Sequence, residues 1–212
     1  MYLPVHFAEC RDQALHGLID AHPFATLVVS GAAGMAVNHL PLLRLDGALR
    51  GHVARGNELA ALDGAPVLAV FHGPQGYVSP NWYPSKHQTG REVPTWNYAV
   101  VHVHGRLRVT YDAHWLRVLL AALTDRFEAA EPRPWKVADA PADHVDKLLG
   151  AIAGIEIAIE RIEGKFKLSQ NHPAANRAGV IAGLERRAQG DDPALAALMQ
   201  AQEQTAAAAQ HR

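Results

Sequence analysis

The spacing of hydrophobic and polar residues predicts a helix and two strands at the start of the chain. Residues 11–22 carry apolar side chains three and four positions apart, and a proline follows directly. Two β-rich segments come next, 24–30 and 35–43, with turn-forming residues at 31–34 between them. We therefore expect a short amphipathic helix followed by two tightly joined strands.

A second set of patterns predicts a hairpin, a short helix and a buried strand. The Asp46-Gly47 pair is typical of a tight turn with positive φ, so a strand over 48–54 should run antiparallel to the preceding one. A short helix is expected over 58–62. The apolar run 66–71 then indicates a strand that is buried on both faces.

The second half of the chain begins with a long strand, predicted over residues 95–111. Asp112 can cap a helix whose apolar side chains share one side, and a proline-rich linker follows at 130–141. A short helix over 142–151 then leads to a segment in which isoleucines alternate with polar or small residues from 155 to 160. That alternation predicts a strand with one solvent-facing side.

These elements predict a mainly β protein with peripheral helices, of the α+β class. About six mostly antiparallel strands fit a small closed or partly open barrel better than a doubly wound sheet, because no regular βαβ alternation is present. Two Ala-rich helices are expected over 173–187 and 193–209, with the last eight residues frayed. We expect a barrel domain over 1–170 and a helical appendage over 171–212.

The segment 77–98 is too rich in proline to be a plain core strand. Its prolines remove backbone donors, so an ordered loop should precede the strand that begins after Pro94. Aromatic faces beside hydroxyls, amides and a lysine suit a flat, polar-edged, anionic ligand, although aromatic residues also pin long loops to a core. The candidate ligand-binding residues of this segment are Tyr77, Ser79, Trp82, Lys86, Thr95, Trp96 and Asn97.

Composition narrows the class of protein. The 212 residues are 49% hydrophobic and 19% charged, which indicates a folded globular chain, and the net charge of −1 provides no general attraction for nucleic acid. No apolar run approaches the ~20 residues needed to cross a membrane. The single cysteine, Cys10, cannot form an intrachain disulfide, and the N-terminus lacks a secretory signal pattern. We therefore expect a cytoplasmic protein.

Several long motifs carry a family resemblance. They are NHLP at 38–41, GHVAR at 51–55, VSPNWY at 78–83, VPTWNY at 93–98 and KFKLSQN at 165–171. With these motifs the chain closely resembles the PaiB-like family of FMN-binding negative transcriptional regulators, over about residues 1 to 188. The resemblance implies an FMN-binding split β-barrel related to the pyridoxamine-phosphate-oxidase-like flavoproteins. It also implies a homodimer that binds FMN at its interface.

The resemblance assigns the flavin phosphate to His52 and Arg55, which lie at the end of the third strand. Asn57 begins the following short helix, whose free N–H groups would also favour an anion. On the neighbouring strand Asn38 and His39 point to opposite faces, and we favour His39 as the cofactor contact. The alternatives are an ordinary loop arginine and a histidine buried in the core.

The resemblance also implies that the segment 165–170 closes the site. Lys165 and Lys167 share a face if this segment is extended, so both could reach one anion, although they could equally be a solvated pair. Within the motif 93–98, alternation places Thr95 and Asn97 on one face and Trp96 on the other. The cofactor contacts expected here are Thr95, Trp96, Asn97, Lys165, Lys167, Ser169 and Gln170.

Three function classes remain open from the sequence. The first is an FMN-binding regulator, the second a flavin-dependent oxidoreductase acting on a small molecule, and the third a haem-handling split barrel. His102 and His104 project the same way from a strand, but no third ligand follows from their spacing, so no metal site is expected. A DNA-binding motif is not visible, although Arg177, Arg186 and Arg187 follow the last family motif.

Overall fold

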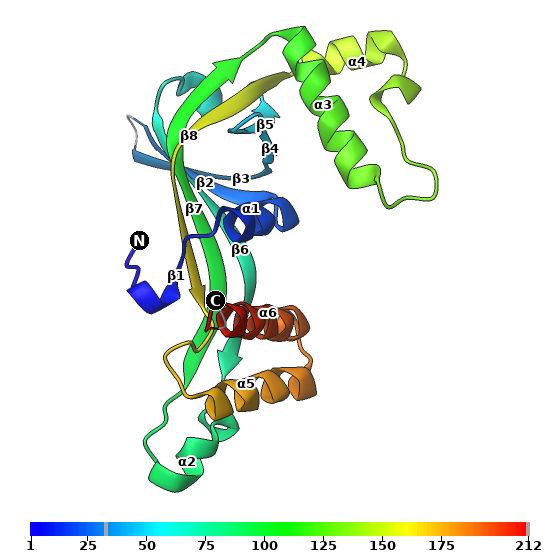
Figure 1. Cartoon of the computed structure of the whole chain (residues 1–212). Helices are drawn as coiled ribbons and strands as arrows, with labels where there is room; N and C mark the ends of the chain where they lie inside the picture. Colours follow the sequence, from blue (N-terminus) through cyan, green and yellow to red (C-terminus); the bar gives the residue numbers. More distant parts are fainter. Residues whose placement is uncertain (32–33, 211–212) are drawn as a thin grey trace. The chain divides into compact units, whose positions relative to one another are not determined.

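The computed structural model describes residues 1–31 and 34–210, the last five of them without their side chains, and contains one eight-stranded sheet (Figure 1). The strand order is β3-β2-β6-β7-β8-β5-β4, and β1 pairs with β8. The strands are β1 (Ala8–Glu9), β2 (Phe24–Gly31), β3 (Gly34–Pro41), β4 (Leu43–Leu45), β5 (Ala48–Ala54), β6 (Pro66–Val78), β7 (Thr95–Thr110) and β8 (Ile152–Lys167).

The predicted count of six strands is too low by two. The segment 35–43 is divided into β3 and β4 at Leu42, and the two-residue β1 is too short to give any alternation in the sequence. The Asp46-Gly47 turn is confirmed: Asp46 has φ 50° and Gly47 has φ 77°, and Leu45 pairs with Ala48 across it. The expected turn at 31–34 includes residues 32 and 33, which lie outside the described residues.

Three long strands, β6, β7 and β8, contribute to both of the compact units into which the chain divides. The first unit comprises residues 1–18, 72–101 and 163–212, and the second comprises residues 19–71 and 102–162. β6 continues to Val78, well beyond the predicted end at Phe71, and β8 extends over sixteen residues. Alternating burial in β6, with Val67, Ala69 and Phe71 inward, shows that this strand has one partly exposed face rather than two buried ones.

In the second unit, buried apolar residues on the strands form the core, and Leu43 packs with Leu119 and Leu123. Leu27, Leu49 and Ile155 are fully buried there. Helix α3 (Ala113–Glu128) packs against α4 (Ala142–Leu149). Asp112 caps α3 as predicted, because its carboxylate accepts a hydrogen bond of 2.7 Å from the Trp115 N–H. Two 3₁₀ helices, η2 (Glu58–Ala61) and η4 (Val137–Asp139), complete the unit.

In the first unit, the C-terminal helices α5 (Ala174–Arg187) and α6 (Asp192–Gln210) pack against each other. α5 also contacts η3 (Pro80–Trp82) and α2 (Pro84–Thr89), which form the proline-rich loop (Figure 1). The remaining helices are η1 (Val5–Phe7) and α1 (Asp12–Ala21), whose last residues belong to the second unit. The division at residue 170 stays a prediction. The expected fraying beyond 204 lies mostly outside the described side chains.

Candidate functional site

The candidate residues predicted from the sequence are distributed between the two units. The second unit holds His39, His52, Arg55 and Asn57. The first unit holds the remaining eleven, which are Tyr77, Ser79, Trp82, Lys86, Thr95, Trp96, Asn97, Lys165, Lys167, Ser169 and Gln170. Each unit contains a pocket beside part of its own set.

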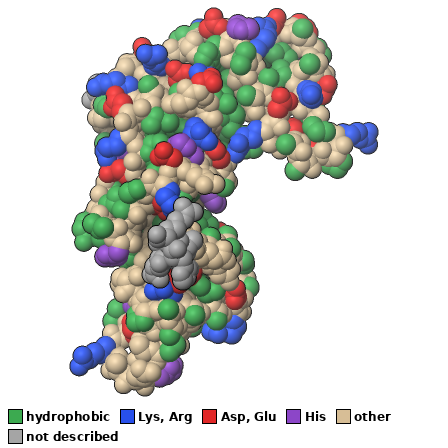
Figure 2. Space-filling model, in the orientation of Figure 1, with side chains coloured by type: hydrophobic (Ala, Val, Ile, Leu, Met, Phe, Trp, Pro, Cys, Tyr) green, Lys and Arg blue, Asp and Glu red, His purple; other side chains and the backbone are tan. Residues whose placement is uncertain are grey.

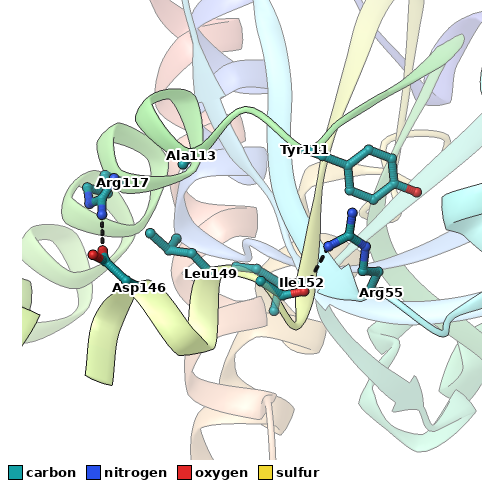
Figure 3. Close-up of a pocket in the computed structure, with 8 residues that line it drawn as sticks. Arg55, Tyr111, Ala113, Arg117, Asp146, Leu149 and Ile152 are labelled. Carbon is teal, nitrogen blue, oxygen red and sulfur yellow. Dashed lines mark hydrogen bonds and ion pairs between the residues drawn. The ribbon is translucent and has the colours of Figure 1, made fainter. Parts of the chain in front are cut away.

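In the second unit, Arg55 lines a pocket of about 340 Å³ at the end of β5 (Figure 3). Its guanidinium lies 4.6 Å from the centroid of the Tyr111 ring, and its Nη1 donates to the Gly150 carbonyl at 3.0 Å. On the opposite wall, Arg117 is paired with Asp146. Arg55 therefore has a fixed orientation with further N–H donors available, and no acidic side chain of the described residues pairs with it.

On β3 and β5 of the second unit, two buried polar atoms have no hydrogen-bond partner among the described residues. Asn57 caps η2 by accepting from the Leu59 N–H at 2.9 Å, and its Nδ2 donates to Asn38 Oδ1 at 2.7 Å. The atoms without a partner are Asn38 Nδ2 and His52 Nδ1. Burial lowers the pKa of His52, so this imidazole is neutral at neutral pH.

The structure places Asn38 rather than His39 beside Asn57. His39 lies on the exposed face of β3, where its Nδ1 is 3.2 Å from Thr26 Oγ1 and its ring stacks on Phe24. Alternation showed that only one of the two neighbours could face inward, but the sequence did not show which. Asn38 is thus a candidate that the sequence reasoning missed, and the role of His39 stays a prediction.

In the first unit, four predicted residues line a second cavity of about 280 Å³: Thr95, Asn97, Lys167 and Ser169. Lys167 Nζ donates to Thr95 Oγ1 at 2.5 Å and to the Trp96 carbonyl at 2.6 Å. Asn97 is fully buried, and its Nδ2 donates to Ser169 Oγ at 2.9 Å. Burial, and then the nearby charge of Lys165, lower the pKa of Lys167.

The same cavity is lined by an acidic residue and a histidine that the sequence reasoning missed. Glu92 Oε1 accepts from Ser85 Oγ at 2.5 Å and from Asn176 Nδ2 at 3.1 Å. Its Oε2 lies 3.8 Å from Nδ1 of His172, whose ring stacks on Tyr83. Ser85 and Glu92 belong to one stretch of the chain and His172 and Asn176 to a distant one, so no local motif could have identified the cluster.

The other candidates of the segment 165–170 have partners within the protein. Lys165 Nζ donates to the Tyr2 carbonyl at 3.0 Å and lies over the rings of Tyr2 and Tyr98. Gln170 bonds the Phe166 carbonyl and the Leu168 N–H, so it stabilises the turn that ends β8. No acidic side chain among the described residues pairs with the Lys165 ammonium.

The aromatic loop is held to α5 largely by its own side chains. The Trp82 ring packs on Gly183, and the Arg187 guanidinium lies 4.9 Å from the ring centroid. Ser79 caps η3 by accepting from the Asn81 N–H, and Lys86 bonds the Asn81 side chain. Trp96 Nε1 donates to Gln75 Oε1 at 3.1 Å, and its ring meets Tyr77 edge-on. The contacts of these aromatic residues are thus explained by their role in holding the loop in place.

A family model described as "Putative FMN-binding domain" matches residues 1–161. The chain belongs to this family. An uncharacterised protein of Emericella nidulans is 34% identical over 87% of this chain and 90% of its own length. The protease synthase and sporulation protein PAI 2 of Bacillus subtilis is 28% identical over 94% of this chain and 97% of its own. The resemblance inferred from the sequence motifs is confirmed.

Solved structures confirm the fold. The FAD and haem binding protein of Mycobacterium smegmatis superposes with a TM-score of 0.58, at 22% identity, over 81% of this chain and 78% of its own. The flavocytochrome Anf3 of Azotobacter vinelandii gives a TM-score of 0.57, at 16% identity, over 76% of this chain and 69% of its own. The chain has the split-barrel fold, with eight strands instead of six.

Proposed function

We propose that this protein binds FMN and that Arg55 binds the phosphate of the flavin. The observation that carries the proposal is the family match over 1–161, which includes both the GHVAR segment and Asn57. FMN has a dianionic phosphate, and a positioned guanidinium is a strong partner for such an anion. Arg55 meets that need, because Tyr111 and Gly150 fix its position and no acidic group in the described part of the chain pairs with it.

Two buried polar groups of the second unit suit the rest of the cofactor. A flavin presents hydroxyl groups along its ribityl chain and carbonyl and N–H groups along one ring edge. Asn38 Nδ2 and His52 Nδ1 are buried without a partner in residues 1–31 and 34–210, and a polar ligand would supply the missing hydrogen bonds. In the first unit, the assignment of Lys165 to the flavin stays a prediction, and its ammonium donates to the Tyr2 carbonyl.

An exposed apolar face on the second unit supports a homodimer. Phe24, Met35 and Val37 are 64%, 70% and 53% exposed, and the register of β2 with β3 places all three on one side of the sheet. Exposed apolar side chains on one side of a sheet are typical of an interface. A second copy of the chain would cover it, as the family resemblance implies.

The regulatory role suggested by the resemblance to PaiB-like proteins does not need direct DNA binding through α5. Arg177 is paired with Glu203 and Arg187 with Asp192, so two of its three candidate basic residues are neutralised within the protein. On the face shown in Figure 2, basic and acidic side chains are interspersed. We therefore propose that any effect on transcription is indirect.

One titration tests the proposal. FMN is added to the purified protein while flavin fluorescence and the visible spectrum are recorded, with riboflavin and haemin in parallel. We expect saturable binding of FMN, weaker binding of riboflavin, and no Soret band from a haem complex. Equal affinity for FMN and riboflavin would show that the site does not bind the phosphate. Tight haemin binding without FMN binding would overturn the proposal.

A further inference from the structure

The cavity of the first unit carries two opposite charges that do not pair with each other. Lys167 and Glu92 both line it, yet no ion pair joins them. Two of the three N–H donors of Lys167 go to uncharged oxygens, and no acidic side chain of the described residues lies within ion-pair distance of its ammonium. A partly buried charge without a counterion is costly, so the site would gain from an anionic group.

Glu92 lines the same cavity and carries the opposite charge, and one of its carboxylate oxygens lacks a close donor. Its side chain is only 18% exposed, and Ser85 and Asn176 satisfy Oε1. In the described part of the chain, the polar neighbour of Oε2 is Nδ1 of His172, at 3.8 Å, which is too long for a hydrogen bond. This oxygen can therefore accept a charged donor from a ligand.

The size and the remaining walls limit the kind of ligand. At about 280 Å³ the cavity is slightly smaller than the roughly 300–1,000 Å³ typical of drug-sized ligands. Phe7, Val93 and Pro94 give it an apolar part. We propose that this cavity binds a small zwitterion of the amino acid class, with its carboxylate on Lys167, its ammonium on Glu92, and its apolar body against Phe7. Thr95, Asn97, Lys167 and Ser169, which the family resemblance assigns to FMN, line this cavity, so the zwitterion replaces that expectation. The inference does not rest on the phosphate contact proposed for Arg55.

Three probes with the same apolar body and different charges test the proposal on the wild-type protein. They are L-phenylalanine, 2-phenylethylamine and 3-phenylpropanoate, which carry both charges, the positive charge alone and the negative charge alone. Calorimetric titration at neutral pH should show L-phenylalanine binding about tenfold or more tightly than either analogue, because each charged contact contributes separately. Equal affinities for the three probes, or no binding of any, would overturn the proposal.

Charge-removing variants then locate the two contacts. Glu92→Gln should weaken L-phenylalanine and 2-phenylethylamine by about tenfold and leave 3-phenylpropanoate unchanged, and Lys167→Met should show the opposite selectivity. Glu131→Gln removes one exposed carboxylate elsewhere and should change none of the three affinities. Loss of all three probes in Glu92→Gln at an unchanged melting temperature would contradict the assignment.

A competition experiment separates this site from the flavin site. FMN at saturation should leave the affinity for L-phenylalanine unchanged, and Glu92→Gln should bind FMN like the wild type. If FMN displaces the probe, the cavity belongs to the flavin and the zwitterion site is wrong. If the protein binds L-phenylalanine but not FMN, the proposed function fails while this inference stands.

Discussion

The ring of Trp82 lies directly against the backbone of Gly183, at a point where a Cβ atom would overlap the ring. One turn earlier on α5, a Cβ at Gly179 would overlap the Trp82 carbonyl. The two glycines are four residues apart, so they open one notch on the helix surface. The C-terminal helices thus fix the loop that precedes β7.

Replacing Gly183 with alanine should destabilise the protein, although alanine favours helices. The overlap with Trp82 would force the ring or the helix to move, at a cost of roughly 1–3 kcal/mol. Gly17→Ala is the matched control, because it also lies in a helix of the first unit and has open space around it. That variant should be neutral or stabilised by up to about 1 kcal/mol. Urea unfolding of both variants measures the difference, and equal stabilities would show that the notch is not tightly packed.

Much of the fold could be predicted because its signals are local. The Asp46-Gly47 turn needs positive φ at both residues, and Asp112 offers a cap to the helix behind it. The start of β7 at Thr95 follows from Pro94, which restricts the residue before it to extended geometry. The two missed strands, β1 and β4, have two and three residues, so tertiary pairing rather than their own pattern creates them.

The candidate site was less predictable because its partners are distant in sequence. Alternation correctly placed Thr95 and Asn97 beside one cavity, since both line it. It could not show that Asn97 would meet Ser169, or that Glu92 would meet His172. Trp82 was a candidate ligand contact on composition, but its actual neighbours, Gly183 and Arg187, depend on how α5 packs.

The ion pair between Arg187 and Asp192 should make stability depend on acid pH. Asp192 is 2% exposed, and its oxygens accept from Arg187 at 2.6 and 2.5 Å. This hydrogen bonding lowers the pKa of Asp192 in the folded state. A lowered folded pKa means that the contribution is fully present above the unfolded value, about 4, and is lost as the pH falls through the folded value.

Asp192→Asn should therefore be less stable than the wild type at pH 7, by roughly 1–3 kcal/mol, and the difference should shrink below pH ~4. Urea unfolding at a series of pH values between neutral and strongly acidic measures it. Asp125→Asn, at an exposed position, is the control and should show little difference at any pH. A gap between wild type and Asp192→Asn that stays constant into acid would contradict this account.

Asn97 should contribute more to the stability of the fold than Trp96 does, although tryptophan is the larger and more apolar side chain. Asn97 is fully buried and bonded to Ser169, whereas Trp96 is 49% exposed and bonds only Gln75 through its indole nitrogen. Asn97→Ala leaves a buried hydroxyl without its partner and should cost roughly 1–3 kcal/mol. Trp96→Phe should cost less than about 1 kcal/mol. Melting temperatures compare the two, and a larger drop for Trp96→Phe would refute the ranking.

The exposed face formed by Phe24, Met35 and Val37 predicts the effect of a charge on assembly. Light scattering of the wild type should give about twice the chain mass of 22.9 kDa. Val37→Glu places a charge at the centre of that face and should give a monomer, because an unpaired charge is costly in an interface. Val118→Glu, at a residue of α3 that is 54% exposed, should remain dimeric. A wild type that scatters as a monomer at micromolar concentration would rule the interface out.

Arg55 should distinguish a flavin with a phosphate from one without. Its guanidinium is oriented by Tyr111 and by the Gly150 carbonyl, so its remaining donors are available to an anion at little entropic cost. A charge-assisted contact of roughly 1.5–3 kcal/mol corresponds to about 10- to 100-fold in affinity. Arg55→Ala should weaken FMN by that factor and riboflavin by much less, as measured by quenching of flavin fluorescence. Arg108→Ala, where the arginine is 74% exposed, is the control and should alter neither affinity. If Arg55→Ala weakens FMN and riboflavin equally, the residue supports the pocket wall and the phosphate is bound elsewhere.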